Sequence, residues 1–70
     1  MDRATIDIPE TEQLLTPDEL SRHLGIPTTT LANWRYLRKG PAFVRIGRHV
    51  RYRTCDVLEW VITQRQASLA

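Results

Sequence analysis

The chain has 70 residues, with ten lysines and arginines against eight acids and a formal net charge of +2. This length allows one small domain, whose core needs most of the large apolar residues and leaves too few for a deep substrate pocket. The single cysteine excludes an intramolecular disulfide, and without a cysteine–histidine cluster we expect no metal site and no cofactor. No apolar run approaches the ~18 residues of a membrane span, and the polar N-terminus is unlike a signal peptide. We therefore expect a cytoplasmic protein without a membrane partner.

The charges are unevenly distributed along the chain. Six of the eight acids lie in residues 2–19, and none lies between Ser21 and Cys55. The same window carries eight cationic side chains, namely Arg22, Arg35, Arg38, Lys39, Arg45, Arg48, Arg51 and Arg53. Such a concentration of positive charge is typical of a surface that binds a polyanion, although a solvated basic face would leave the same pattern.

A first helix is predicted to follow a flexible N-terminal arm of residues 1–13. Thr16 can cap its first turn, and Glu19, three residues later, completes a capping box. We expect the helix to run to about Leu24 and to end at Gly25, since glycine readily adopts the left-handed cap conformation.

A second helix is predicted to begin after only a few residues. It starts near Pro27 and continues to about Leu37, and polar side chains in its first turn can satisfy free backbone N–H groups. Lys39, Gly40 and Pro41 then end it.

Residues 43–53 predict a short β-hairpin with a turn near Gly47–Arg48, because apolar and basic residues alternate on both sides of that turn. We expect one face of the hairpin to be lined by arginine and the other to be apolar. The residues expected on the apolar face are Val44, Ile46, Val50 and Tyr52.

Thr54 is predicted to cap a third helix. Its apolar stripe comprises Val57, Leu58, Trp60, Val61 and Ile62. We expect the helix to fray through residues 64–66. The chain is thus expected to divide into an arm of residues 1–13, a folded domain of residues 14–66 and a loose C-terminus of residues 67–70.

Six positions counted from Gly25 match the spacing of a helix-turn-helix. Small or apolar residues stand where two short helices across a tight turn touch each other and a shared core, and these residues are Leu20, Ser21, Leu24, Ile26, Leu31 and Trp34. Together with the hairpin and the third helix, they predict a mainly α protein with a two-stranded β-hairpin. This is a winged helix-turn-helix of three helices plus a wing.

In a helix-turn-helix, the second helix presents its N-terminal residues and outer face to the major groove of DNA. The residues predicted at these positions are Thr28, Thr29, Ala32, Asn33 and Tyr36. The Asn33 amide can pair with an adenine edge through two hydrogen bonds, and small neighbours allow close approach. An ordinary solvated helix face would carry similar residues.

A second group of side chains is predicted to contact the DNA backbone or the minor groove. It comprises Arg35, Arg38, Lys39, Arg45, Arg48, His49, Arg51 and Arg53. Arginine at a wing tip is attracted by the negative potential of the minor groove. Two structural interpretations compete with this one: charge keeps an edge ribbon soluble, and cations near a helix C-terminus complement the helix dipole.

Four aromatic side chains are predicted to belong mostly to the core rather than to stack on single-stranded nucleic acid. They are Trp34, Phe43, Tyr52 and Trp60. A domain this small needs them for its own packing.

Seven runs of the sequence together carry a resemblance to a known family. They are Leu14–Leu20, Leu24–Pro27, Thr30–Leu31, Trp34–Arg35, Gly40–Pro41, Val44–Tyr52 and Asp56–Trp60. Over about residues 14–64 the chain resembles the MerR-like winged-helix domains of phage and mobile-element excisionases and AlpA-type regulators. The resemblance implies a recognition helix at residues 28–37 and a wing at residues 43–53. For a DNA-binding protein of this kind we expect a nucleoid-associated location in the cytoplasm.

The resemblance also implies an architectural role on DNA. Excisionases of this kind bind repeated sites in attachment DNA, often cooperatively, bend it and direct an integrase toward excision, and some act as repressors. We therefore expect double-stranded DNA, an integrase and further copies of the chain as partners. The short stretch after the wing, without the long dimerising helix and effector domain of full-length MerR-type regulators, favours an excisionase or a minimal regulator.

Three functions remain open at this point. An excisionase is favoured over a small transcriptional regulator of the same fold, and a protein-interaction module that keeps only the fold is the third. We do not expect an enzyme, because the sequence offers no nucleophile–base–acid set, no paired carboxylates and no phosphate-cradling glycine loop.

Overall fold

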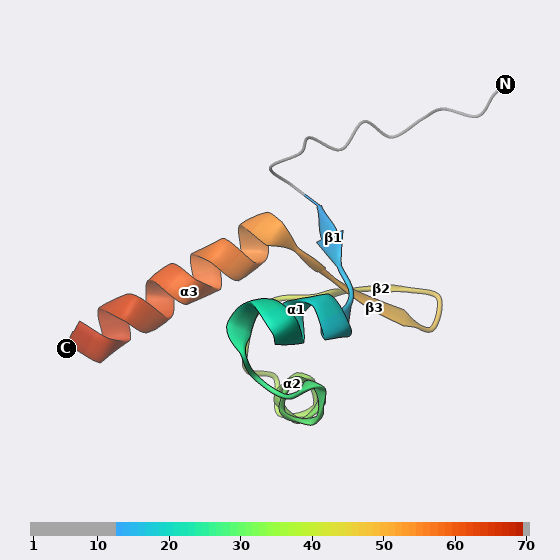
Figure 1. The fold of residues 1–70 in the computed structure, drawn as a ribbon, viewed down its shortest axis with the longest axis horizontal. Helices are drawn as coiled ribbons and strands as arrows, with labels where there is room; N and C mark the ends of the chain where they lie inside the picture. The colour runs from blue at the N-terminus through green and yellow to red at the C-terminus, as the bar shows by residue number, and fades with distance from the viewer. Residues whose placement is uncertain (1–12, 70) are drawn as a thin grey trace, which may run out of the picture.

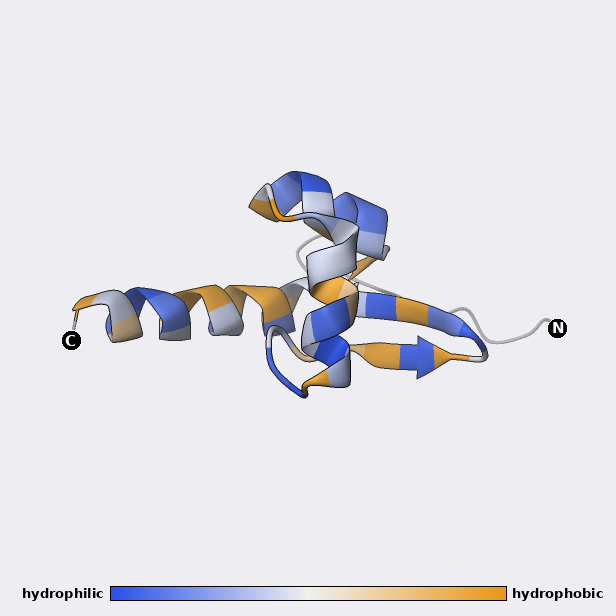
Figure 2. Cartoon of the chain, turned by 90° about the horizontal axis from the view of Figure 1, so that it is seen from below, coloured by the Kyte–Doolittle hydropathy of each residue, from blue (hydrophilic) through white to orange (hydrophobic). Residues whose placement is uncertain are grey.

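The computed structural model describes residues 13–69, and its elements follow the predicted order. Figure 1 shows a short strand, two helices, a hairpin and a long helix. They are β1 (Leu14–Leu15), α1 (Pro17–Leu24), α2 (Thr28–Tyr36), β2 (Val44–Ile46), β3 (His49–Arg53) and α3 (Thr54–Leu69). Helix α3 and the hairpin extend in opposite directions from the α1–α2 pair (Figures 1 and 2). The winged helix-turn-helix fold is thereby confirmed.

Strand β1 was not predicted from the sequence. It adds a third strand to the hairpin in an antiparallel sheet of order β1-β3-β2. The predicted arm of residues 1–13 lies outside the described residues except for Gln13. The Gln13 carbonyl accepts a hydrogen bond from the Thr54 N–H at 3.0 Å, so Gln13 extends the pairing of β1 with the end of β3.

Helix α1 begins and ends as its residues predict. The Glu19 N–H donates to the Thr16 hydroxyl at 3.1 Å, and the Thr16 N–H donates to Glu19 Oε1 at 2.9 Å, which closes the capping box. At the other end Gly25 has φ +68°, and its N–H donates to the Ser21 carbonyl at 2.8 Å. A tight turn of three residues then leads into α2.

The core lies where α1, α2 and β3 meet. Leu20, Leu31 and Tyr52 are buried, one from each of these elements. Partly buried apolar residues surround them, namely Leu15, Leu24, Ile26, Trp34, Phe43, Val50 and Val57. Five of the six positions counted from Gly25 therefore lie in the core, as a helix-turn-helix requires.

The register of the hairpin corrects the predicted division into an apolar and an arginine-lined face. Val44 pairs with Arg51, Arg45 with Val50, and Ile46 with His49. Directly opposed residues project from the same face, so each face carries both kinds of side chain. Figure 2 shows hydrophilic and hydrophobic residues alternating along both strands. The prediction failed because a two-residue loop sets a register one residue away from the assumed one.

Helix α3 is longer than predicted. It continues through Leu69, whereas residues 64–66 were expected to fray and residues 67–70 to be loose; Ala70 lies outside the described residues. Residues 64–67, Gln-Arg-Gln-Ala, are good helix formers, and neither glycine nor proline interrupts them. Within residues 13–69, no helix is both long and apolar enough to cross a membrane.

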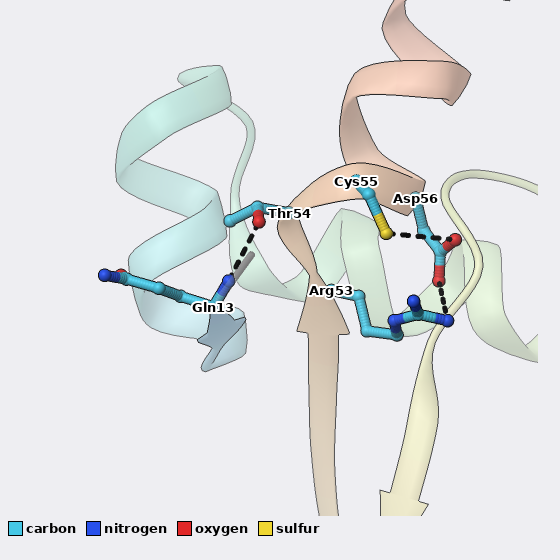
Figure 3. Close-up of polar contacts among 5 residues, drawn as sticks. All are labelled: Gln13, Arg53, Thr54, Cys55 and Asp56. Atoms are coloured by element: carbon cyan, nitrogen blue, oxygen red, sulfur yellow. Dashed lines mark hydrogen bonds and ion pairs between the residues drawn. The ribbon is translucent and has the colours of Figure 1, made fainter. Parts of the chain in front are cut away.

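The junction between β3 and α3 is held by polar contacts (Figure 3). The Gln13 N–H donates to the Thr54 hydroxyl at 2.9 Å, which ties β1 to the first residue of α3. Arg53 lies 4.0 Å from the Asp56 carboxylate, and the Cys55 thiol donates to the same carboxylate at 3.9 Å. These contacts fix the start of α3 at the end of the sheet.

Candidate nucleic-acid interface

Helix α2 presents a continuous exposed face. Thr29, Ala32, Asn33 and Tyr36 are spaced by three or four residues, so they share one side of the helix, and all four are exposed. The Tyr36 side chain is 84% exposed. Thr28 is half-buried at the first residue of the helix. The structure thus brings together four of the five residues predicted to read the major groove.

The opposite side of α2 is anchored in the core, which fixes the direction of the exposed face. Leu31 is fully buried, and Trp34 packs against the Trp60 ring of α3 with ring centres 5.5 Å apart. Phe43 packs against Tyr52 with ring centres 6.2 Å apart. These four aromatic rings therefore serve the core, as predicted.

Arg35 joins α2 to the wing. Its Nη1 donates to the Tyr52 hydroxyl at 2.7 Å. The guanidinium carbon also lies 5.9 Å from the centre of the Phe43 ring and 6.0 Å from that of Tyr52, within the range of cation–π attraction. Sequence reasoning placed Arg35 only among the DNA-backbone contacts, and a contact of that kind stays a prediction. Its structural role could not be read from the sequence because its partners lie 8 and 17 residues away.

Helix α2 ends in a Schellman motif. The Lys39 N–H donates to the Trp34 carbonyl at 2.8 Å, and the Arg38 N–H donates to the Arg35 carbonyl at 3.2 Å. Arg38 takes up the left-handed position with φ +61°. Arg38 and Lys39 were both predicted to contact the DNA backbone. Both side chains are exposed, at the start of the loop that leads to the wing.

The remaining residues predicted to contact the DNA backbone or minor groove lie on the wing, and their surroundings differ. Gly47, with φ +63°, begins the two-residue loop and leaves Arg48 exposed at its tip beside the exposed His49. The exposed Arg45 has its guanidinium carbon 5.5 Å from the centre of the Phe43 ring. Arg51 is half-buried and donates to the Val50 carbonyl at 2.7 Å.

Among residues 13–69, Arg53 is the wing cation that has an acidic neighbour. Its ion pair with Asp56 spans 4.0 Å at the base of the hairpin. The four acids among residues 13–69 all lie on α1 or α3, namely Asp18, Glu19, Asp56 and Glu59. Helix α2 and the hairpin carry only positive charges, so these two elements form the most cationic part of the described chain.

One titratable group has a shifted pKa. Hydrogen bonding by the Thr16 backbone N–H, which favours the charged carboxylate, lowers the pKa of Glu19 below its ordinary value of 4.5. The effect belongs to the capping box of α1 and not to the cationic surface.

Comparison with known proteins assigns this fold to a family. Residues 14–65 match the helix-turn-helix domain family, which includes excisionase-like and AlpA-like small DNA-binding proteins. The match covers α1, the turn, α2, the hairpin and most of α3, and the chain belongs to this family. No curated protein and no solved structure matches the chain. The helix-turn-helix domain is a DNA-binding domain, so the exposed face of α2 and the cationic hairpin are its candidate interface.

Proposed function

From its membership of the helix-turn-helix domain family, we propose that this protein is an excisionase. It binds double-stranded DNA sequence-specifically, bends attachment-site DNA and directs an integrase toward excision, acting by binding alone and without catalysis. One observation carries the DNA-binding part of the proposal. The exposed face from Thr29 to Tyr36 belongs to α2, and Arg35 of the same helix joins it to a hairpin that carries only positive charges.

In this proposal α2 reads base edges in the major groove. The Asn33 amide both donates and accepts hydrogen bonds, as pairing with adenine requires. Ala32 beside it has no side chain beyond a methyl group, which permits close approach and contact with a thymine methyl. Thr29 and Tyr36 flank this pair, and their hydroxyls can bond to bases or to phosphate.

The wing supplies affinity with little sequence preference. Arg48 at the exposed tip contacts the backbone or enters the adjacent minor groove, and Arg45 and His49 add positive charge next to it. Contacts of this kind position the protein on the duplex, whereas the base contacts of α2 select the sequence.

The excisionase role rests on the resemblance of residues 14–64 to excisionases and AlpA-type regulators. A small transcriptional regulator with the same interface is the second candidate, supported by the same resemblance. The two roles differ in their effect on recombination, because only an excisionase changes the direction in which an integrase acts.

We further propose that copies assist one another when they bind neighbouring sites. Helix α3 exposes four large apolar side chains, namely Leu58, Val61, Ile62 and Leu69. They share one side of the helix by their spacing and offer apolar area to a second copy. On DNA with two adjacent sites, Ile62→Ser should reduce cooperativity and leave single-site affinity unchanged. Unchanged cooperativity would rule out this contact.

The direct test of the excisionase role is a recombination assay with the integrase and attachment-site DNA. Added protein should shift the products toward excision and bend the DNA, as resolved by energy transfer between its labelled ends. Arg48→Ala should impair both effects. DNA binding without any change in the direction of recombination would refute the excisionase role and favour the regulator.

A further inference from the structure

Arg38 has a backbone conformation that arginine does not favour. Its φ of +61° makes it the one non-glycine residue with positive φ within residues 13–69. The position directly after the C-cap of a Schellman motif is most often glycine, because a Cβ atom is strained there. Strained backbone positions of this kind cluster at functional sites, which suggests a function for the Arg38 side chain.

The surroundings of Arg38 suit an anion. An open hollow of about 510 Å³ lies between the end of α2 and the start of the wing, and it is lined by Arg35, Arg38, Lys39 and residues 40–43. Lys39 is exposed beside Arg38. Along residues 13–69, neither of these two side chains has an acidic partner, in contrast to Arg53.

The length of α2 places this hollow near a DNA strand when the helix lies in the major groove. Nine residues make a helix of about 13 Å, and the major groove of B-DNA is about 12 Å wide. If the N-terminal part of the exposed face reads bases, the C-terminal end reaches the edge of the groove. Phosphates lie at that edge.

We propose that Arg38 and Lys39 form a binding site for one backbone phosphate of double-stranded DNA, separate from the wing tip. This inference rests on the proposed DNA-binding function. After the left-handed turn at Arg38 the chain leaves the helix, and both residues line the hollow. Glycine would adopt this backbone conformation with less strain but would lack the positive charge. A purely structural role, in which the cations only complement the helix dipole, predicts no loss of DNA affinity when the charge is removed.

Arg38→Gly separates these two roles because it removes the charge and suits the backbone. We expect its melting temperature to equal or exceed that of the unsubstituted protein. In DNA titrations at several salt concentrations, the slope of log K against log salt should become shallower by about 1. The affinity loss should be alike for specific and random duplexes. Lys39→Ala should also flatten the slope. Arg65→Ala on α3, measured on a duplex with one site so that contacts between copies do not contribute, is the control that should leave it unchanged.

Single neutral methylphosphonates in the bound duplex locate the contact. One position should weaken binding of the unsubstituted protein and have no further effect on Arg38→Gly. An unchanged salt slope for Arg38→Gly, or a lower melting temperature, would overturn the inference. Failure of the unsubstituted protein to bind duplex DNA would instead refute the proposed function, so the two failures are distinguishable.

Discussion

At the scale of single residues, Gly40 is the described glycine that leaves the least room for a side chain. Its φ is +83°, and a Cβ atom there would lie 2.8 Å from Trp34 Cε3 and 3.2 Å from Trp34 Cβ. The Trp34 ring cannot withdraw easily because it packs against Trp60. The loop between α2 and the wing therefore passes over Trp34 only without a side chain at position 40.

We predict that Gly40→Ala lowers the free energy of unfolding by about 2–4 kcal/mol, from steric overlap together with backbone strain. Gly47→Ala is the control: its φ of +63° brings similar strain, but no atom lies within 4 Å of the added Cβ. Urea unfolding of both variants provides the comparison. Equal losses of stability would show that packing against Trp34 is unimportant.

The capping box predicts how stability depends on acidity. The pKa of Glu19 is lowered in the folded chain by hydrogen bonding from Thr16. A lowered pKa adds stability above the ordinary value of 4.5, and that stability is lost as the pH falls through the lowered pKa. The melting temperature should therefore fall on acidification below about pH 4.5, and less steeply in Glu19→Gln. Identical acid profiles for the two proteins would contradict this role.

At the scale of elements, local signals predicted most of the fold. Thr16, Glu19 and Gly25 mark the ends of α1 because caps depend on neighbouring residues alone. The hairpin was found for the same reason, but its register was wrong because the loop, not the hydrophobic pattern, determines which residues face each other. Strand β1 is only two residues long, so its pairing with β3 depends on tertiary contacts that leave no periodicity in the sequence.

The hydrogen bond between Arg35 and Tyr52 helps to hold α2 against the wing. Tyr52→Phe removes the hydroxyl that accepts from Arg35 at 2.7 Å and leaves the ring in place. We predict a loss of about 0.5–1.5 kcal/mol in the free energy of unfolding, with weaker DNA binding because the two binding elements are less firmly joined. Tyr36→Phe makes the same chemical change at an exposed site and should not alter stability. Equal stability of Tyr52→Phe and the unsubstituted protein would disprove this role.

At the scale of the whole molecule, the uneven charge distribution of the sequence corresponds to a cationic part of the structure. Because acids are absent between Ser21 and Cys55, the sequence alone predicted a cationic region, and α2 and the hairpin carry it together. The exposed stripe from Thr29 to Tyr36 was also predictable, since helical periodicity determines which residues share a face. The roles of Arg35 and of the left-handed Arg38 were not, because both depend on where the chain turns in space.

A binding titration at several salt concentrations tests most directly how α2 and the wing recognise DNA. It compares candidate attachment-site DNA with random duplexes. We expect a steep decrease of affinity with salt and a clear preference for the attachment site. Asn33→Ala should relax the preference and retain the salt dependence, whereas Arg48→Ala should weaken binding to all duplexes alike. Equal affinity of the unsubstituted protein for every duplex, or loss of preference in Arg48→Ala but not in Asn33→Ala, would contradict this division of roles.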